Sequence, residues 1–321
     1  MKDNLEKILG FVIDVNFSSH EEMSEMSKLW ELEQIQIEKG SFKGSLHGVH
    51  TPHIQLSKAI RSHGVIVKGK TPENSYTFSY VNGIGEITHN GLPLTSNELL
   101  VLDDNDKVDF TSNGSSYDVT IAIDKDFFQK IYKEFFGVTF TYDRNKNRIE
   151  LTKTKDHNIY AVSERWRIFL TKHLDEWIHD SALTEQIEKR IIETLCSHMG
   201  VVKDKKILSS EKNAIALHHY IDKHYREDMT IKEICCILKI SERGVRPSFK
   251  KIFGFNPKEY LSRYRLGKFR NSLIKNSDDK PSISIIGSEE GLFHQSRLSK
   301  EYKEMFGYLP SDITGKEKTD S

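Results

Sequence analysis

The twelve residues FKKIFGFNPKEY at 249–260 occur again, in altered form, as YKEMFGYLPSDI at 302–313. The two stretches align without gaps at an offset of 53 residues. Each has a glycine and, three residues later, a proline at matching positions. In each copy an apolar helical face ends at the glycine, which readily adopts the left-handed backbone of a helix C-cap, and the proline then prevents continuation. The pattern predicts two copies of one helical unit.

A second helix is predicted upstream of each copy. TIKEICCILKI at 230–240 places apolar residues on one face, with the small Cys235 at a close-packing point, and Ser241 is a suitable N-cap for the next helix. In the second copy, SISIIGSEE at 282–290 is followed by a turn at Gly291. Helix, short turn and helix is the arrangement of a helix-turn-helix unit, although a helical repeat used only for protein packing is the alternative.

The two units, at 230–254 and 282–307, are joined by a predicted long helix at 258–274. In a helix-turn-helix the second helix is the recognition helix, here termed the reading helix. A continuous connector fixes the distance between the two reading helices, which could then enter successive major grooves of DNA separated by roughly 34 Å. The connector also carries four cationic side chains, Arg263, Arg265, Lys268 and Arg270.

Three motifs within residues 208–315 carry a family resemblance: IKEICCILKISER, FKKIFGFNPKEYLSRYRL and GLFHQSRLSKEYKEMFGYLPSD. This part of the chain resembles the DNA-binding domain of the AraC/XylS family of bacterial transcription regulators. The third motif is the most specific, and its form is closest to the ethanolamine-utilisation regulator branch. The resemblance implies a double helix-turn-helix that binds double-stranded DNA, and a regulator that usually activates by contacting RNA polymerase.

The resemblance also implies which side chains face DNA. A lone Arg or Lys on a helix is more often a solvated charge, and the motif register is what favours a binding role here. Phe293, at the start of the second reading helix, is expected to pack rather than to contact DNA. The expected DNA-binding residues are Arg243, Arg246, Lys250, His294, Gln295, Ser296, Arg297 and Lys300.

The first reading helix departs from the family pattern at Gly244 and Pro247. Six residues after the Ser241 N-cap, a proline removes the hydrogen bond to the Arg243 carbonyl, which costs about 3 kcal/mol in a helix interior. We therefore expect a helix that is bent or that begins later, near Pro247 itself, and that reads bases less than the second helix does.

The N-terminal part predicts a different architecture. Short apolar or alternating runs separated by turn-prone segments over residues 32–124 indicate a β-sandwich or a cupin-like barrel. We expect an α+β multidomain protein with a β-rich sensor or oligomerisation domain at 1–155 and two bridging or dimerisation helices at 156–200. A linker at 201–212 and a DNA-binding domain at 213–316 follow.

Charge separates the two parts of the chain. The whole chain has a net charge of zero, but residues 201–321 carry 24 Lys and Arg against 17 Asp and Glu, so the first 200 residues carry the compensating negative charge. A basic C-terminal part is typical of nucleic-acid binding. No apolar run is long enough for a membrane span or a signal peptide, and the three cysteines form no spaced motif, so we expect a cytoplasmic protein with no membrane partner.

Three closely spaced histidines stand in the first half of the chain, in the segment HGVHTPH. His47, His50 and His53 are spaced by three, which does not place all three on one face of a strand. We expect no metal site and no cofactor in this protein. No nucleophile elbow, P-loop or dinucleotide fingerprint is present, so we expect no enzyme.

The expected function is a DNA-binding regulator that responds to a small-molecule effector, with a homodimer possible. The alternatives are an N-terminal domain that only dimerises, and a β-barrel enzyme.

Overall fold

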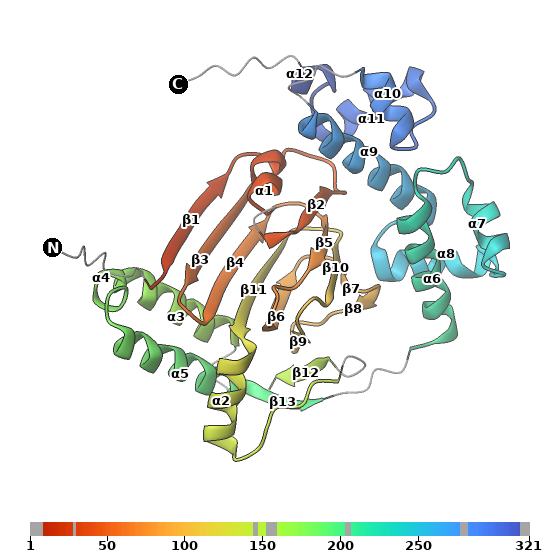
Figure 1. Cartoon of the computed structure of the whole chain (residues 1–321). Helices are drawn as coiled ribbons and strands as arrows, with labels where there is room; N and C mark the ends of the chain where they lie inside the picture. Colours follow the sequence, from red (N-terminus) through yellow and green to blue (C-terminus); the bar gives the residue numbers. More distant parts are fainter. Residues whose placement is uncertain are drawn as a thin grey trace.

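The computed structural model describes residues 9–27, 30–143, 147–151, 159–202, 207–276 and 282–314. These residues form an N-terminal β-rich domain and a C-terminal helical domain that lies against one side of it (Figure 1). The expected fold class is confirmed. Within the described ranges, no helix combines the length and the apolar character needed to cross a bilayer.

Two antiparallel sheets face each other in the N-terminal domain. The eight-stranded sheet has the order β1 (Phe11–Phe17), β3 (Gly44–His50), β4 (Ile54–Arg61), β11 (Ser116–Asp124), β6 (Ser75–Gly83), β9 (Glu98–Leu102), β12 (Arg148–Leu151) and β13 (Met199–Val202). The five-stranded sheet has the order β2 (Glu33–Gln36), β5 (Val65–Lys70), β10 (Lys107–Ser112), β7 (Ile87–His89) and β8 (Leu92–Pro93). The helix α1 (His20–Ser27) lies between β1 and β2 in the chain.

The period-two alternation of β11 shows how the sequence divides the two faces of the larger sheet. Val119, Ile121 and Ile123 are buried in the hydrophobic core outside the barrel. Asp118 and Thr120, which alternate with them, line a cavity between the sheets. Successive strand residues point to opposite faces, so one strand supplies both an apolar core and a partly polar interior.

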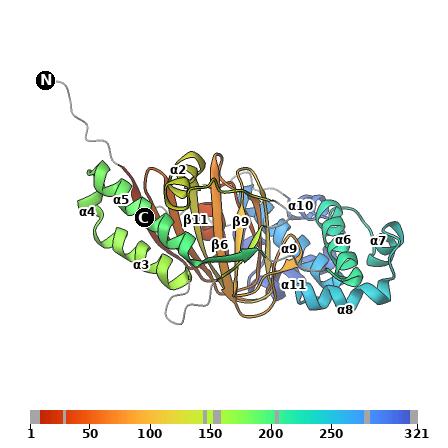
Figure 2. The same cartoon turned by 90° about the horizontal axis from the view of Figure 1, so that it is seen from below.

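Four helices cover the outer face of the eight-stranded sheet: α2 (Lys125–Phe136), α3 (Ile159–Lys172), α4 (Leu174–Trp177) and α5 (Ser181–His198). Phe128 and Trp177, both fully buried, lie in the core between these helices and the sheet. Figure 2 shows α3, α4 and α5 on the side of the sheet away from the C-terminal domain. The helices expected at 156–200 therefore connect the domains along the chain, while in space they cover the β domain.

The segment expected as a linker, 201–212, contains regular structure at both ends. Residues 201–202 belong to β13, which pairs with β12 and so returns the chain to the eight-stranded sheet. Helix α6 (Ser209–His224) already begins before residue 212. Residues 203–206, in the middle of the expected linker, lie outside the described part of the structure.

The C-terminal domain packs on the outer face of the five-stranded sheet. After α6 it comprises α7 (Ile231–Ile237), α8 (Glu242–Phe253), α9 (Pro257–Lys275), α10 (Ile283–Glu289), α11 (Gln295–Phe306) and α12 (Ser311–Thr314). Ile35 of β2 and Ile66 of β5 are fully buried in one core with Leu217 of α6 and Tyr260 of α9. The two domains therefore share an apolar core.

Charged side chains surround this core along β2 and α9. The Lys268 ammonium lies 2.8 Å from the Glu33 carboxylate. The Arg270 guanidinium, which is almost completely buried, lies 2.6 Å from Glu21 of α1 and donates to Gln36 Oε1 at 2.7 Å. These contacts anchor the middle of α9 to the β domain.

Gly267 allows α9 to approach β2 this closely. A Cβ atom at this position would lie 2.3 Å from Ile35 Cγ2 and 3.0 Å from the Gln36 carbonyl oxygen. Real Cβ contacts are not that short, so the position requires a residue without a side chain.

Candidate nucleic-acid interface

The first unit, α7 and α8, is defined by caps at both helix starts. The Thr230 hydroxyl accepts a hydrogen bond from the Glu233 amide at 3.3 Å, and the Glu233 carboxylate accepts one from the Thr230 amide at 2.7 Å, which is a capping box. The Ser241 hydroxyl accepts from the Gly244 amide at 3.2 Å and so caps α8. Between the helices Lys239 has a φ of 55°, which makes the turn sharp.

Helix α8 is amphipathic. Its buried residues are Val245, Phe249, Ile252 and Phe253, which pack into the core shared with the five-stranded sheet. The helix ends at Gly254, whose φ of 78° is left-handed and whose amide donates to the Lys250 carbonyl at 2.9 Å. The predicted glycine C-cap is confirmed. Asn256 then caps α9, in which Pro257 is the first residue.

The second unit, α10 and α11, has the same order of elements. Gly291 has a φ of 79° in the turn, and the Leu292 amide donates to the Gly287 carbonyl at 2.8 Å. The last turn of α11 ends at Gly307, with a φ of 89°. His294 is the N-cap residue of α11 but its side chain makes no capping hydrogen bond.

The buried faces of α8 and α11 coincide at the repeat offset of 53 residues. The buried residues of α11 are Leu298, Tyr302, Met305 and Phe306, which correspond one by one to the four buried residues of α8. The remaining faces of both helices point to solvent. Each unit therefore presents one exposed helix face of the kind that can enter a DNA groove.

Most of the expected DNA-binding residues lie on these exposed faces. On α8, Arg243, Arg246 and Lys250 are exposed, although Arg246 also pairs with Glu242 one turn earlier. On and beside α11, the exposed residues are His294, Ser296, Arg297 and Lys300. The Gln295 side chain lies outside the described part of the structure. Their DNA-binding roles remain predictions.

The expectation for Phe293 was wrong. Its side chain is 41% exposed, just before α11, and it contributes to a groove between the two units. A large apolar side chain generally favours burial, but Phe293 lines this groove instead.

Pro247 does not delay or interrupt α8, contrary to the expectation from sequence. The helix runs continuously from Glu242 to Phe253 with Pro247 inside it. Both Pro247 and Arg243, whose carbonyl loses its helical donor, are exposed. Water can therefore solvate that carbonyl, and the four buried residues of α8 hold the helix in place.

The connector cations are used inside the protein. Arg265 donates to the carbonyls of Tyr225 at 2.6 Å and Glu227 at 2.7 Å, which fixes α9 to the end of α6. Arg263 donates to the Ile37 carbonyl at 2.8 Å, and Lys268 and Arg270 make the contacts with the β domain described above. Part of the positive charge of the C-terminal region is therefore structural.

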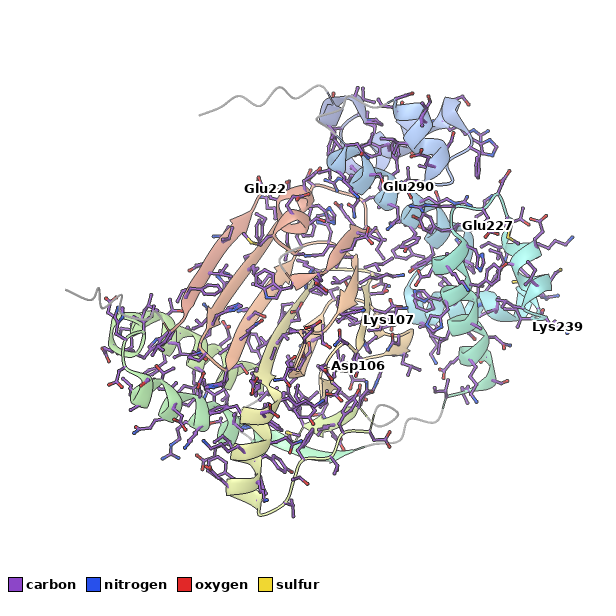
Figure 3. All side chains as sticks on the ribbon, in the orientation of Figure 1. Glu22, Asp106, Lys107, Glu227, Lys239 and Glu290 are labelled. Atoms are coloured by element: carbon purple, nitrogen blue, oxygen red, sulfur yellow. The ribbon has the colours of Figure 1, made fainter. Side chains whose placement is uncertain are left out.

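Sequence reasoning missed Glu290, which lies between α10 and the turn (Figure 3). Its carboxylate is 4% exposed and accepts hydrogen bonds from the hydroxyls of Tyr225 and Ser272, both at 2.7 Å, and from Arg226 at 3.2 Å. Burial raises its pKa, but these donors outweigh burial, so the net pKa is below the usual range. Glu290 therefore joins the second unit to α6 and α9. In the sequence it is only an acidic residue beside a turn glycine, and no local pattern predicts these contacts.

The histidines of HGVHTPH have separate partners. His47 lies 2.6 Å from Asp14, His53 lies 2.8 Å from Glu188, and the His50 ring stacks on Phe11 at 4.3 Å between centroids. Each ring therefore has a local structural role.

A family model described as a helix-turn-helix domain matches residues 234–315. Over 93 residues, the XylDLEGF operon transcriptional activator of Pseudomonas putida is 28% identical and shares 29% of each chain. The C-terminal domain is of the AraC/XylS family. The finer resemblance of this AraC/XylS domain to the ethanolamine-utilisation branch stays a prediction.

Other relatives match the same AraC/XylS domain. The regulatory protein HrpB of Ralstonia nicotianae is 28% identical over 103 residues, which are 32% of this chain and 22% of that protein. The chain therefore aligns with only about a quarter of the length of these relatives. The crystal structure of the AraC-like transcriptional activator CuxR aligns over 80% of this chain and 94% of that one, at 13% identity and a TM-score of 0.41.

Proposed function

We propose that the protein is a sequence-specific, DNA-binding transcription regulator of the AraC/XylS type, acting in the cytoplasm and without enzymatic activity. The observation that carries the proposal is the equivalence of α8 and α11, which bury matching residues at one offset and expose the faces that bear Arg243 and Arg297. Rigid connection through α9 lets both faces meet one side of a duplex.

The test uses the full-length chain with DNA from upstream of its own gene and with random DNA. Arg297→Ala should weaken binding to the specific site by about 1–3 kcal/mol more than binding to random DNA, because a base contact is lost. Arg190→Ala is a suitable control, since Arg190 is exposed on α5, far from the reading helices. Equal losses on both DNAs would make Arg297 a phosphate contact, and no DNA binding by the folded chain would refute the proposal.

We further propose that a small-molecule effector binds between the two sheets. A cavity of about 170 Å³ lies there. Its wall on the eight-stranded sheet carries hydroxyls and the Arg61–Asp118 ion pair, whereas Val67, Val108 and Phe110 form an apolar wall on the five-stranded sheet. Such a lining suits a compact ligand with one polar and one apolar side.

The cavity is coupled to the DNA-binding domain through β2. Gln34 lines the cavity and accepts a hydrogen bond from Arg61 Nε at 3.0 Å. The main-chain carbonyl of the same residue accepts from Asn271 of α9 at 2.7 Å. A ligand that displaces Gln34 would therefore act on α9, which carries both units. An effector that binds the native state must raise the melting temperature, so compounds can be screened with the wild type and with a cavity-filling Ser79→Phe variant as the control.

The alternative is an N-terminal domain that only dimerises. One observation favours pairing as such: Ile168 and Phe169 of α3 are 53% and 41% exposed on the side away from the C-terminal domain. A homodimer through α3 is compatible with effector binding. Ultracentrifugation of Ile168→Glu tests it, since a buried charge should shift a dimer towards monomer. Contact with RNA polymerase is a proposal that follows from the family alone.

A further inference from the structure

A polar cluster lies where α6 crosses the outer face of the five-stranded sheet. Asp109 of β10 and the neighbouring His218 and His219 of α6 each offer one ligand atom, and these atoms lie within 4.8 Å of one another. Asp109 is 1% exposed and His218 is fully buried, whereas His219 is exposed. Residues of both domains therefore converge at a point that solvent reaches from one side.

The Asp109 carboxylate lacks the donors that a buried carboxylate requires. Neither of its oxygens has a hydrogen-bond partner among the residues that the structure describes. The Lys107 ammonium lies 3.7 Å from Oδ2, but its side chain is 66% exposed. A buried anion with so little compensation is unfavourable unless a cation joins it.

His218 is held by contacts to one of its two ring nitrogens. Its Nε2 lies 2.9 Å from the buried Tyr260 hydroxyl, and its ring stacks on Phe253 at 4.4 Å between centroids. Burial lowers its pKa to about 3, so the ring is neutral at pH 7. With the proton on Nε2 the lone pair is on Nδ1, which makes no hydrogen bond within the described chain and lies 4.0 Å from Asp222. A polar partner on the second ring nitrogen is typical of metal-bound histidines.

We propose that Asp109, His218 and His219 bind a divalent first-row transition-metal ion that joins the β domain to the DNA-binding domain. Two imidazole nitrogens and one carboxylate oxygen form a ligand set suited to Zn²⁺ or Co²⁺, with water in the fourth position. Ligand atoms around tetrahedral zinc are about 3.4 Å apart, so the ligand atoms must approach one another by up to about 1.4 Å. The exposed His219 ring has the freedom to do so.

The sequence gives no signal of this site. Asp109 and His218 are far apart in the chain, and adjacent histidines on a helix diverge by about 100°. Their rings nevertheless lie 5.6 Å apart here. The proposal does not depend on DNA binding, because the ligands lie away from the reading faces of α8 and α11.

The test is metal binding to the chelator-treated full-length protein. Calorimetry with Zn²⁺ and visible absorption with Co²⁺ should both show one ion per chain. Changing a residue that only hydrogen-bonds to a metal ligand typically weakens metal binding by about 10–100-fold. Because His219→Ala removes a ligand itself, it should weaken Zn²⁺ binding by at least that much. Because His219 is exposed, this variant should fold. Asp109→Asn, which keeps the side-chain shape, should lose binding as well.

His224→Ala is the matched control, because His224 lies on the same helix and interacts with Glu227. At the same Zn²⁺ concentration, the melting temperature should rise more in the wild type and in this control than in His219→Ala. Equal Zn²⁺ affinity in the wild type and His219→Ala would overturn the proposal, as would the absence of binding by the folded wild type.

Discussion

The two helix-turn-helix units share one sequence pattern but differ in what holds them. The first unit packs its apolar face into a core that includes Ile35 and Ile66 of the five-stranded sheet. The second unit has a separate core with the C-terminal half of α9. It contacts the β domain mainly through polar groups. The Gly40 amide donates a hydrogen bond to the Met305 carbonyl at 3.0 Å, and the Tyr308 hydroxyl donates one to the Glu21 carboxylate.

A repeated apolar register therefore determines the shape of each unit, while its neighbours determine its attachment. The first unit is joined to the β domain by a shared core, and the second mainly by charges and hydrogen bonds. Apolar substitutions should act most strongly through the first attachment, and changes in pH or charge through the second.

The largest effect is expected for Phe249→Ala in the first unit. Removing a fully buried aromatic side chain should lower the free energy of unfolding by about 3–5 kcal/mol. All three tryptophans, Trp30, Trp166 and Trp177, belong to the β domain, so their fluorescence reports its unfolding. In urea titrations, Phe249→Ala should shift the fluorescence transition, because the core is shared.

The counterpart Phe306→Ala tests the comparison. It should reduce helicity, measured by circular dichroism, at lower urea concentration, with a smaller shift in the fluorescence transition. Identical fluorescence shifts in the two variants would mean that the units are attached in the same way.

Glu21→Gln probes the polar attachment of the second unit. Burial raises the pKa of Glu21, but Arg270 and the Tyr308 hydroxyl lower it to about 2 overall. A carboxyl with a depressed folded-state pKa stabilises the protein above its unfolded pKa, and this contribution, about 3 kcal/mol, is lost as pH falls from about 4.5 to about 2. Urea unfolding across this range should show the loss in the wild type and not in Glu21→Gln.

Glu22→Gln is the control, since Glu22, on the same helix and labelled in Figure 3, bonds only locally to Ser18. A wild-type stability that does not change between pH 4.5 and 2, or an equal effect of Glu22→Gln, would show that Glu21 contributes little.

Pro247→Ala should raise the free energy of unfolding by about 1–2 kcal/mol. The substitution restores a helical donor worth up to about 3 kcal/mol, from which the greater entropy of the unfolded chain subtracts about 1 kcal/mol. Lys300→Ala, at the equivalent exposed position of α11, should change stability by less than about 0.5 kcal/mol. Thermal melts of both variants and of the wild type measure these changes in stability. A lower stability of Pro247→Ala than of the wild type would show that the fold depends on the proline.

Apart from the control variants, the smallest effect is expected for Gly244→Ala. A Cβ at this position would meet only Ser241, at ordinary contact distances of 3.5 and 3.6 Å, and the substitution should stabilise α8 by about 0.5–1 kcal/mol. Gly254→Ala should destabilise instead, because its φ is positive and a Cβ would overlap the Asn113 side chain. Differential scanning calorimetry distinguishes the two, and a gain in both variants would contradict the assigned C-cap.

Local signals in the sequence were sufficient for the units themselves. The glycine and proline positions predicted the ends of α8 and α11, and Ser241 predicted the start of α8, because caps depend on neighbouring residues. The prediction that Pro247 bends or delays α8 was wrong, because helix propensity describes an isolated helix. In the folded protein the packing of residues such as Phe249 stabilises α8.

Contacts between distant segments could not be predicted. Glu21 meets Arg270 across 249 residues, and β13 pairs with β12 after a helical segment, so no periodicity links the partners. The charge count also overstated the cations available for DNA, since Arg265 and Arg270 are bonded within the protein. Side-chain partners of this kind follow only from the tertiary arrangement.

Gly267 sets the minimum thickness of the contact between β2 and α9. Every other amino acid adds at least a Cβ atom, which would overlap Ile35 and press against the Gln36 carbonyl, so β2 and α9 could not keep this distance. Both units are attached to α9, so a shift of α9 should move them together. The spacing between the β domain and the DNA-binding domain therefore depends on a single residue that lies apart from the exposed faces of α8 and α11.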